Sequence, residues 1–243
     1  ENIFFNLIDN NSFDNTYNIL KKIENNFSNV KVTKNNVNGC SSGRNLALKS
    51  LIKNYEFILF LDSDHIIKCG SVVDYMISNI KSDVMYVGYY GGIINYNNYI
   101  RSELINSTDE IIIKKGDNKY IGTGLSLVKY NLIYINNILF DINFDPFLIE
   151  DVDFCFNILN YSNVKKLKLS DNVIHNNHAT ISKLKKKSYD QILKKNTYYF
   201  MAKYNLINKK IFNNNFINQT NFNYAINNID KPFGIFDDNI NID

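Results

Sequence analysis

Short apolar runs rich in β-branched residues alternate along the chain with longer segments of helical period. Strands of this kind are predicted at residues 3–8, 30–33 and 56–61. A helix follows the first strand, and the helical period returns over residues 42–53, ahead of the third strand. Residues 56–61 are apolar on both faces, which is typical of a central strand in a parallel sheet. This alternation predicts an α/β domain.

The rest of the chain continues the pattern less regularly. Further helices are predicted at residues 71–80, 151–159 and 188–206, and further strands at 84–87 and 122–128. The helix over 188–206 reads as a surface helix. From residue 208 onward the periodicity is weak. We therefore predict one domain over residues 1–206, followed by an Asn-rich tail over 207–243 that is loosely attached.

Composition excludes several classes of protein. Apolar residues make up 45% and charged residues 21% of the 243, so the chain is globular rather than disordered. The net charge of +3 is too small an excess to indicate binding of nucleic acid. Three scattered cysteines fit reduced thiols in the cytoplasm better than a disulfide framework. No apolar run approaches the roughly 18 residues that span a bilayer.

One segment fits contact with a membrane surface. The basic run at residues 183–187 precedes the aromatic group at 198–200, a combination of cationic and apolar surface that suits peripheral binding at the inner face of a membrane. A solvated lysine-rich loop is the alternative, and we favour it.

Two carboxylates one residue apart, Asp62 and Asp64, directly follow the apolar strand at 56–61. In open parallel sheets, ligands bind at the carboxyl ends of the strands. Such carboxylates repel each other unless a cation lies nearby, and oxygen ligands suit Mg²⁺ or Mn²⁺, which also bind diphosphate. The alternative is a solvated turn capped by an aspartate.

A second acidic group lies at the predicted start of the helix at 151–159. Glu150, Asp151 and Asp153 are three acids within four residues, after a loop that contains an aromatic pair and a proline. Carboxylates at this position complement the helix dipole. One held there can also act as a general base toward an acceptor hydroxyl. Both interpretations stay open at this point.

Basic and imidazole groups complete the candidates. Arg44 opens the helix ahead of the strand at 56–61, where it could contact phosphate or could be an ordinary surface arginine. His175 and His178 follow a short apolar strand, and an isolated histidine is more often structural than a ligand. His65 reads as a neighbour of the acidic turn.

Taken in order, these segments resemble the family 2 glycosyltransferases of the GT-A fold, and most of all their rhamnosyltransferase-like branch. The resemblance runs from about residue 3 to about residue 205. Its motifs are IDNNSFDNT at 8–16, NG…GRN at 38–45, FLDSD at 60–64, GTGLSL at 122–127, EDVDF at 150–154, VIH at 173–175, and KN…KY at 195–204. Each motif alone is modest, but their order and spacing together are specific.

The resemblance implies a GT-A fold with a mostly parallel sheet and flanking helices. It also implies transfer of a sugar from a nucleotide-diphosphate donor to a hydroxyl of a glycan or glycolipid acceptor, with inversion of the anomeric carbon. By its match to the family's ED pair, Asp151 would be the general base. Glu150 beside it would support the base or bind the acceptor.

The resemblance assigns the other candidates to the donor and its ion. The implied ion is Mn²⁺ or Mg²⁺, with carboxylate and imidazole ligands: Asp64, Asp62, and His175 with His178 as its substitute. The donor's base and phosphates would be contacted by Asp9 and Arg44.

The chain departs from the family pattern in two ways. It begins at the strand that is second in the family, so an unpaired position in the sheet is expected. Asn10 stands where many members have a second aspartate. Activity of the chain as given is therefore in question.

Three other functions remain as alternatives. A nucleotidyltransferase of similar fold would want a Gly-rich basic loop after its first strand, a region that this chain does not include. A non-catalytic carbohydrate-binding or scaffold domain would keep the fold without turnover. A phosphatase with an Asp-x-Asp strand ranks low, because His65 and Ile66 follow the motif here rather than Gly-Thr.

Overall fold

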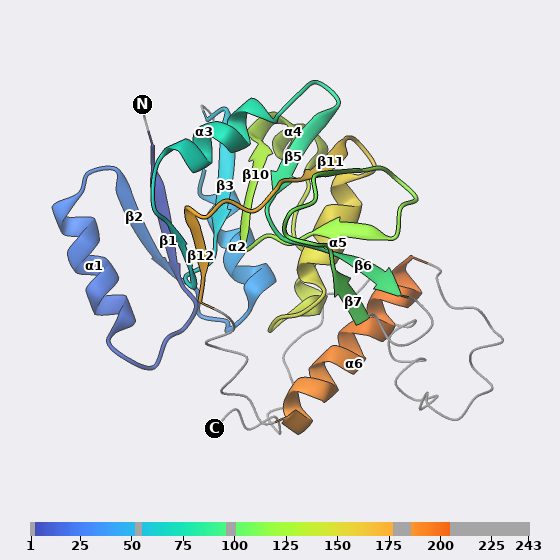
Figure 1. The fold of residues 1–243 in the computed structure, drawn as a ribbon. Helices are drawn as coiled ribbons and strands as arrows, with labels where there is room; N and C mark the ends of the chain where they lie inside the picture. Colours follow the sequence, from blue (N-terminus) through green and yellow to red (C-terminus); the bar gives the residue numbers. More distant parts are fainter. Residues whose placement is uncertain (1–2, 52–54, 96–100, 177–185, 205–243) are drawn as a thin grey trace.

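The computed structural model describes residues 3–51, 55–95, 101–176 and 186–204 (Figure 1). The predicted tail at 207–243 and His178 lie outside these residues. None of the described helices is long and apolar enough to cross a lipid bilayer.

The chain opens with a parallel pair of strands joined by a helix. β1 (Phe5–Asp9) and β2 (Val30–Lys34) pair with Asp9 opposite Lys34, and α1 (Thr16–Asn26) connects them. β1 ends at a turn in which Asn11 adopts a left-handed backbone with φ of 63°, a conformation that asparagine tolerates well. The β1–α1–β2 unit therefore agrees with the sequence pattern.

A five-stranded sheet forms the centre of the molecule. Its strands, in spatial order, are β3 (Phe57–Leu61), β10 (Leu125–Lys129), β5 (Val84–Gly88), β11 (Asn163–Lys166) and β8 (Ile111–Ile113). β5 and β11 run parallel, whereas β10 is antiparallel to both β3 and β5, and β8 is antiparallel to β11.

The α/β class is confirmed, but the prediction of a mostly parallel sheet is wrong. The chain reaches β10 through an excursion of short strands rather than through a helical crossover, and only parallel neighbours need such a crossover. The prediction that residues 56–61 form a central parallel strand is also wrong, since β3 pairs only with β10 within the described part of the chain. Likewise, β1 pairs only with β2 there.

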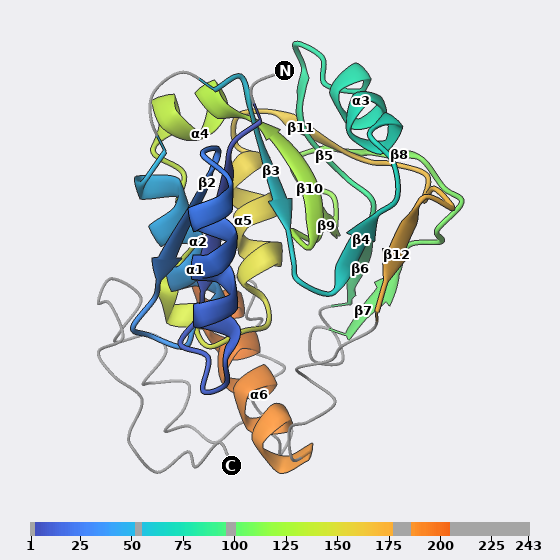
Figure 2. The same cartoon turned by 90° about the vertical axis from the view of Figure 1, so that its left-hand side faces the viewer.

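Two smaller sheets flank the centre. β4 (His65–Ile67) pairs antiparallel with β12 (Val173–His175). β6 (Gly91–Asn95) lies between β7 (Arg101–Leu104) and β9 (Lys119–Ile121), antiparallel to both. Figure 2 shows β4 and β12 side by side, to the right of β3.

Helices pack around these sheets. They are α2 (Cys40–Lys49), α3 (Ser71–Ser78), α4 (Tyr130–Asn136), the 3₁₀ turn η1 (Ile142–Phe144), α5 (Glu150–Ile158) and α6 (Lys186–Lys203). In both Figure 1 and Figure 2, α3 and α6 lie at opposite ends of the molecule.

An aromatic cluster fixes β3 against α5. The rings of Phe140 and Phe154 stack with centroids 4.0 Å apart, and Phe60 meets both edge-on at 5.5 and 5.7 Å. All three side chains are buried in one hydrophobic cluster. Because Phe60 lies two residues before Asp62 and Phe154 three residues after Asp151, this cluster positions both acidic segments.

The prediction of a surface helix at 188–206 is wrong for its second half. In α6 the run from Asn196 to Ala202 is buried, together with Ile192. Phe144, Phe156 and Phe200 pack together in this region, so the helix closes the core rather than covering it from outside. Its first turn, at Lys186 and Lys187, is exposed.

Candidate active site

The acidic turn, residues 62–64 directly after β3, is held by backbone hydrogen bonds on two sides. The backbone N–H of Asp62 donates to the carbonyl of Gly124 at 2.8 Å, and the N–H of Asn176 donates to the carbonyl of Asp64 at 2.8 Å. The turn is thereby tied both to the start of β10 and to the end of β12. Backbone bonds of this kind fix where the carboxylates lie before any ligand arrives.

Arg44 joins the two acidic segments. Its guanidinium donates to Asp62 at 2.9 and 3.2 Å and to Glu150 at 3.0 Å, and it lies over the ring of Phe140. Burial opposes the charge on this side chain, but the two carboxylates hold the pKa of Arg44 above its usual value. The guanidinium predicted to contact phosphate, that of Arg44, therefore already bridges the end of β3 and the start of α5.

The position of Arg44 follows from how α2 begins. Asp145 caps this helix, since its carboxylate accepts from the N–H of Ser41 at 2.8 Å and of Ser42 at 3.2 Å. The N–H of Cys40 also donates to the carbonyl of Pro146. A carboxylate at a helix N-terminus is favoured by the exposed N–H groups and by the dipole. The loop before α5 thus anchors the helix that carries Arg44.

The three acids of α5 face different surroundings. Leu148 and Ile149 have left-handed backbones with φ of 75° and 73°, and this bend leads the chain into the helix. Burial raises the pKa of both Glu150 and Asp151. A neighbouring carboxylate adds to each rise, that of Asp151 for Glu150 and that of Asp62 for Asp151. Asp153 instead points toward α6, where Lys203 lies 2.8 Å away. The helix start therefore presents Glu150 and Asp151 to the site and Asp153 to the core.

A short glycine-containing bend connects the two groups of carboxylates. A Cβ at Gly122 would lie 3.1 Å from Oδ2 of Asp151, and a Cβ at Gly124 would lie 3.4 Å from Oδ2 of Asp62. Two residues of chain span at most about 7 Å. Because the same bend contacts both carboxylates, the structure brings Asp62 and Asp151 to one edge of the molecule.

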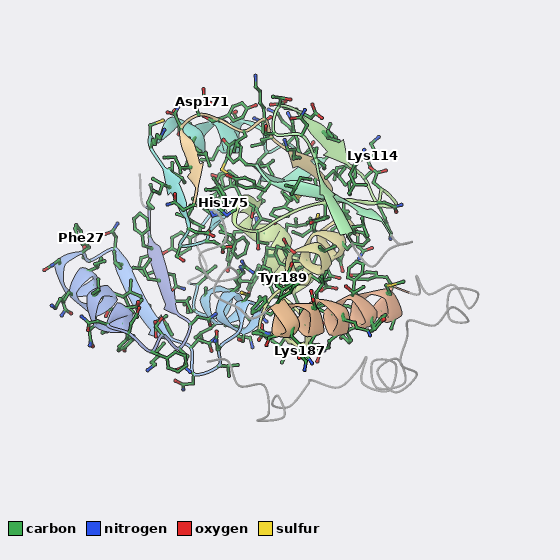
Figure 3. All side chains as sticks on the ribbon, turned by 60° about the horizontal axis from the view of Figure 1, so that its bottom comes forward. Phe27, Lys114, Asp171, His175, Lys187 and Tyr189 are labelled. Atoms are coloured by element: carbon green, nitrogen blue, oxygen red, sulfur yellow. The ribbon has the colours of Figure 1, made fainter. Side chains whose placement is uncertain are left out.

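Asp64 lies among imidazoles. Its Oδ1 is 2.9 Å from Nδ1 of His65, and its Oδ2 is 3.3 Å from Nε2 of His175. The two imidazole rings stack with centroids 4.1 Å apart, and Tyr90 contacts both. Burial, followed by the neighbouring His175, lowers the pKa of His65, which favours its neutral form. Figure 3 shows His175 well apart from Lys187 and Tyr189 of α6.

This cluster fits a divalent cation. Asp64, His65 and His175 each offer one ligand atom, and these atoms all lie within 4.8 Å of one another. Within the described residues, Oδ1 of Asp64 and both ring nitrogens of His65 are buried without a hydrogen-bond partner. Carboxylate and neutral imidazole are the protein ligands of Mn²⁺ and related ions. Sequence reasoning missed His65, because its proximity to His175 depends on the pairing of β4 with β12.

Asp9 lies at the carboxyl end of β1 and is 1% exposed. Its backbone carbonyl accepts from Asn35, but neither carboxylate oxygen has a partner among the residues that the structure describes. A buried carboxylate without a donor costs free energy, so this side chain suits a ligand that brings an N–H or O–H group. The described contacts connect Asp9 to Asn35 rather than to the acidic turn.

Comparison with known proteins gives a family match and several similar folds. Residues 3–133 match the family described as Glycosyl transferase family 2. The crystal structure of S. aureus TarS 1-349 has a TM-score of 0.54 and 18% identity, over 93% of this chain and 60% of that one. The same fragment in complex with UDP has a TM-score of 0.53 and 19% identity, over 93% and 61%.

A third structure, GalNAc-T7 with UDP, GalNAc and Mn²⁺, has a TM-score of 0.55 and 13% identity, over 83% of this chain and 45% of that one. At these identities the likeness concerns the fold alone. The chain spans about 60% of the length of the TarS fragment. No curated protein sequence matches it significantly.

Proposed function

Because the chain belongs to glycosyl transferase family 2, we propose that it transfers a sugar from a nucleotide-diphosphate donor to a hydroxyl of a glycan or glycolipid, with inversion of the anomeric carbon. The family and the GT-A fold that the sequence suggested are confirmed, while the rhamnosyltransferase-like branch stays a prediction. The UDP bound in structures of TarS and GalNAc-T7 supports a nucleotide donor.

One observation carries the proposal. Arg44 bridges Asp62 at the end of β3 and Glu150 at the start of α5, so the acidic turn and the predicted base lie at one edge. Inverting transfer needs this arrangement, since the acceptor hydroxyl must be deprotonated while the diphosphate departs from the opposite side of the sugar.

We assign the general base to Asp151. Its carboxylate takes the proton of the acceptor hydroxyl while that oxygen forms a bond to the anomeric carbon and the bond to the diphosphate breaks. Burial raises the pKa of Asp151, and a base with a raised pKa accepts a proton more readily. Glu150 keeps Arg44 in place and borders the acceptor side.

The donor side is assigned to the remaining candidates. Asp64 and His175, with Asp62 close by, would hold Mn²⁺ or Mg²⁺ at the diphosphate, and His178 stays a predicted substitute for His175. A bound divalent ion would neutralise the negative charge that develops on the leaving group. Asp9, buried and without a donor in the described structure, would accept a hydrogen bond from the nucleoside, and Arg44 would border the phosphates.

We place this reaction in the cytoplasm. The three cysteines are free, as expected of a reducing compartment. The aromatic group at 198–200, which was predicted to contact a membrane together with the basic run at 183–187, is buried in α6, and most of that basic run lies outside the described residues, so we do not extend the proposal to membrane binding.

The test is a panel of UDP-, GDP- and dTDP-sugars with Mn²⁺, with release of nucleoside diphosphate as the readout and donor affinity measured by calorimetry. Asp151→Asn should lower turnover about 10²- to 10⁴-fold, the range of a general base, with donor affinity nearly unchanged. Asp153→Asn is the matched control on the same helix, because it faces Lys203 and should affect stability rather than turnover.

Other outcomes favour other functions. Normal turnover with weakened donor affinity in Asp151→Asn would make Asp151 a binding residue. Release of pyrophosphate from a nucleoside triphosphate and a sugar phosphate would identify a nucleotidyltransferase. Donor binding without hydrolysis or transfer, across the whole panel, would identify a non-catalytic domain.

A further inference from the structure

We propose that His65 is a protein ligand of the same ion, so that the centre has one carboxylate and two imidazoles and prefers late first-row ions to Mg²⁺. The proposal rests on the proposed function only in placing that ion at the donor diphosphate. Ion binding by Asp64, His65 and His175 can be measured without any sugar donor.

Strand pairing places His65 opposite His175. In the antiparallel pair of β4 and β12, these two residues are direct partners, and Asp64 immediately precedes β4. Directly opposed residues of an antiparallel pair project from the same face of the sheet. All three side chains therefore reach one point from two strands, rather than from a single flexible loop.

The distances suit a shared ion. Ligand atoms held about 2.1 Å from an ion lie about 3 Å apart when they are neighbours and about 4.2 Å apart when they are opposite. Asp64 Oδ1 lies 2.9 Å from His65 Nδ1, and Asp64 Oδ2 lies 3.3 Å from His175 Nε2. The ligand atoms of the three residues all lie within 4.8 Å of one another, so a small shift of the side chains would bring them to coordination distance from one ion.

The close contact between Asp64 and His65 lacks the angles of a well-formed hydrogen bond. Although the two atoms lie 2.9 Å apart, both are buried, and neither makes a hydrogen bond within the described part of the chain. Polar atoms that approach closely without bonding each other are costly unless a third group satisfies both. A cation between Asp64 and His65 satisfies an oxygen and a nitrogen at once.

The surroundings of His65 place its ring beside Asp64 and His175. Gly124 leaves room for it, since a Cβ there would lie 2.8 Å from Cε1 of His65. Tyr90 meets the ring edge-on at 5.1 Å. The ring is stacked on that of His175 with only 10° between their planes, so the two must tilt for both nitrogens to face one ion. The terminal torsion of histidine is broad, which makes this tilt inexpensive.

Two imidazoles change the preference of the site. Mg²⁺ favours oxygen ligands and an octahedral set of waters, whereas the affinity of imidazole sites rises from Mn²⁺ through Co²⁺ to Ni²⁺. The contribution of His65 to affinity should therefore be small for Mg²⁺, larger for Mn²⁺ and larger again for Co²⁺.

The experiment compares the wild-type chain with His65→Phe, which keeps an aromatic ring against His175 and Tyr90 but removes the ligand. Calorimetric titration with Mg²⁺, Mn²⁺ and Co²⁺ should show about a tenfold or greater loss of Mn²⁺ affinity, a larger loss for Co²⁺ and little change for Mg²⁺. Pulsed electron paramagnetic resonance of bound Mn²⁺ should detect two coordinated imidazole nitrogens in the wild type and one in His65→Phe.

Tyr90→Phe is the matched control, since it alters a ring that contacts both histidines without removing a ligand, and it should leave ion affinity unchanged. Equal losses for all three ions in His65→Phe, or an unchanged nitrogen signal, would overturn the proposal. If the ion data hold but no donor is turned over, the proposed function fails and His65 remains a ligand. If transfer depends on Mn²⁺ while His65→Phe binds this ion normally, the assignment of His65 as a ligand fails and the proposed function stands.

Discussion

Gly124 controls the space that His65 occupies beside the acidic turn. A methyl group at this position would lie 2.8 Å from Cε1 of His65 and 3.4 Å from Oδ2 of Asp62. The first distance is too short for a Cβ, so in Gly124→Ala the imidazole ring must leave the position that it holds beside Asp64. We predict about a tenfold loss of Mn²⁺ affinity, the size of effect seen when the shell around a metal ligand is disturbed.

Gly70→Ala is the control for this substitution. Nothing lies within 4 Å of a Cβ at Gly70, and its φ of −62° suits alanine. Its ion affinity should equal that of the wild type in the same calorimetric titration. Equal affinities in Gly124→Ala and the wild type would show that the ring position observed here does not matter for binding.

At the residue scale, the carboxylates of the candidate site could be predicted from the sequence more readily than the histidine and arginine side chains that contact them. Asp62, Asp64 and Asp151 could be selected because their positions after an apolar strand and at a helix start match, in order and spacing, the motifs of the family that the sequence resembles. His65 could not, because only the pairing of β4 with β12 brings it to His175. The two-sided ion pair of Arg44 was equally hidden, since it depends on how α2 meets α5.

At the element scale, Asn45 fastens α2 to the segment before η1. Its amide N–H donates to the carbonyl of Phe140, and its amide oxygen accepts from the N–H of Phe140, both at 2.8 Å. These buried bonds satisfy a stretch of backbone that has no strand partner. In Asn45→Ala both backbone groups lose their partner, so we predict a loss of about 2–4 kcal/mol in the free energy of unfolding.

Urea denaturation measures this loss. Asn18→Ala is the matched control, because the side chain of Asn18 bonds only at the exposed surface of α1, to Asn15, and should change stability by less than about 0.5 kcal/mol. If the two variants were equally stable, the buried amide pairing would not hold α2 in place.

Strand and helix positions were predictable where local pattern decides them, and strand direction was not. β1, β2 and β3 fall within one or two residues of their predicted positions because apolar runs and turn formers mark them. β10 also lies where expected, but its antiparallel direction depends on the path through β6–β9, which leaves no local signal. For α6, weak amphipathicity concealed that its second half is buried.

At the scale of the whole molecule, α6 holds together the loop that aims the predicted base. The side-chain amide of Asn196 donates to the carbonyls of Phe144, Phe147 and Leu148 at 2.8–2.9 Å. At the end of this loop the backbone of Leu148 and Ile149 is left-handed, and the chain then enters α5. α6 thus holds the loop that leads into the helix carrying Asp151.

Lys203 completes this anchor. It lies 2.7 Å from Asp141 and 2.8 Å from Asp153, which is fully buried. Burial tends to raise the pKa of both acids. For Asp141 the attraction of Lys203 outweighs burial and lowers the pKa, whereas for Asp153 burial prevails and the pKa is raised. Tyr199 and Tyr204 donate to these same carboxylates.

Lys203→Met should therefore destabilise the protein in a pH-dependent way. At neutral pH it leaves the carboxyl groups of Asp141 and Asp153 without their cation, at a cost of about 3–5 kcal/mol. Asp141, with its lowered pKa, contributes stability that is present above its unfolded pKa and is lost as the pH falls through the folded value. Removing Lys203 abolishes that contribution and raises the pKa of both acids. The deficit should therefore shrink as the pH falls and both carboxylates become protonated in the folded variant.

Urea unfolding of the wild type and Lys203→Met at neutral and acidic pH measures this difference. Lys187→Met is the control on the same helix, because Lys187 is exposed in the first turn and should cost less than about 0.5 kcal/mol at either pH. A deficit that stays constant with pH would mean that Lys203 acts through its contacts with the rings of Phe144 and Tyr204 rather than through its pairing with the two carboxylates.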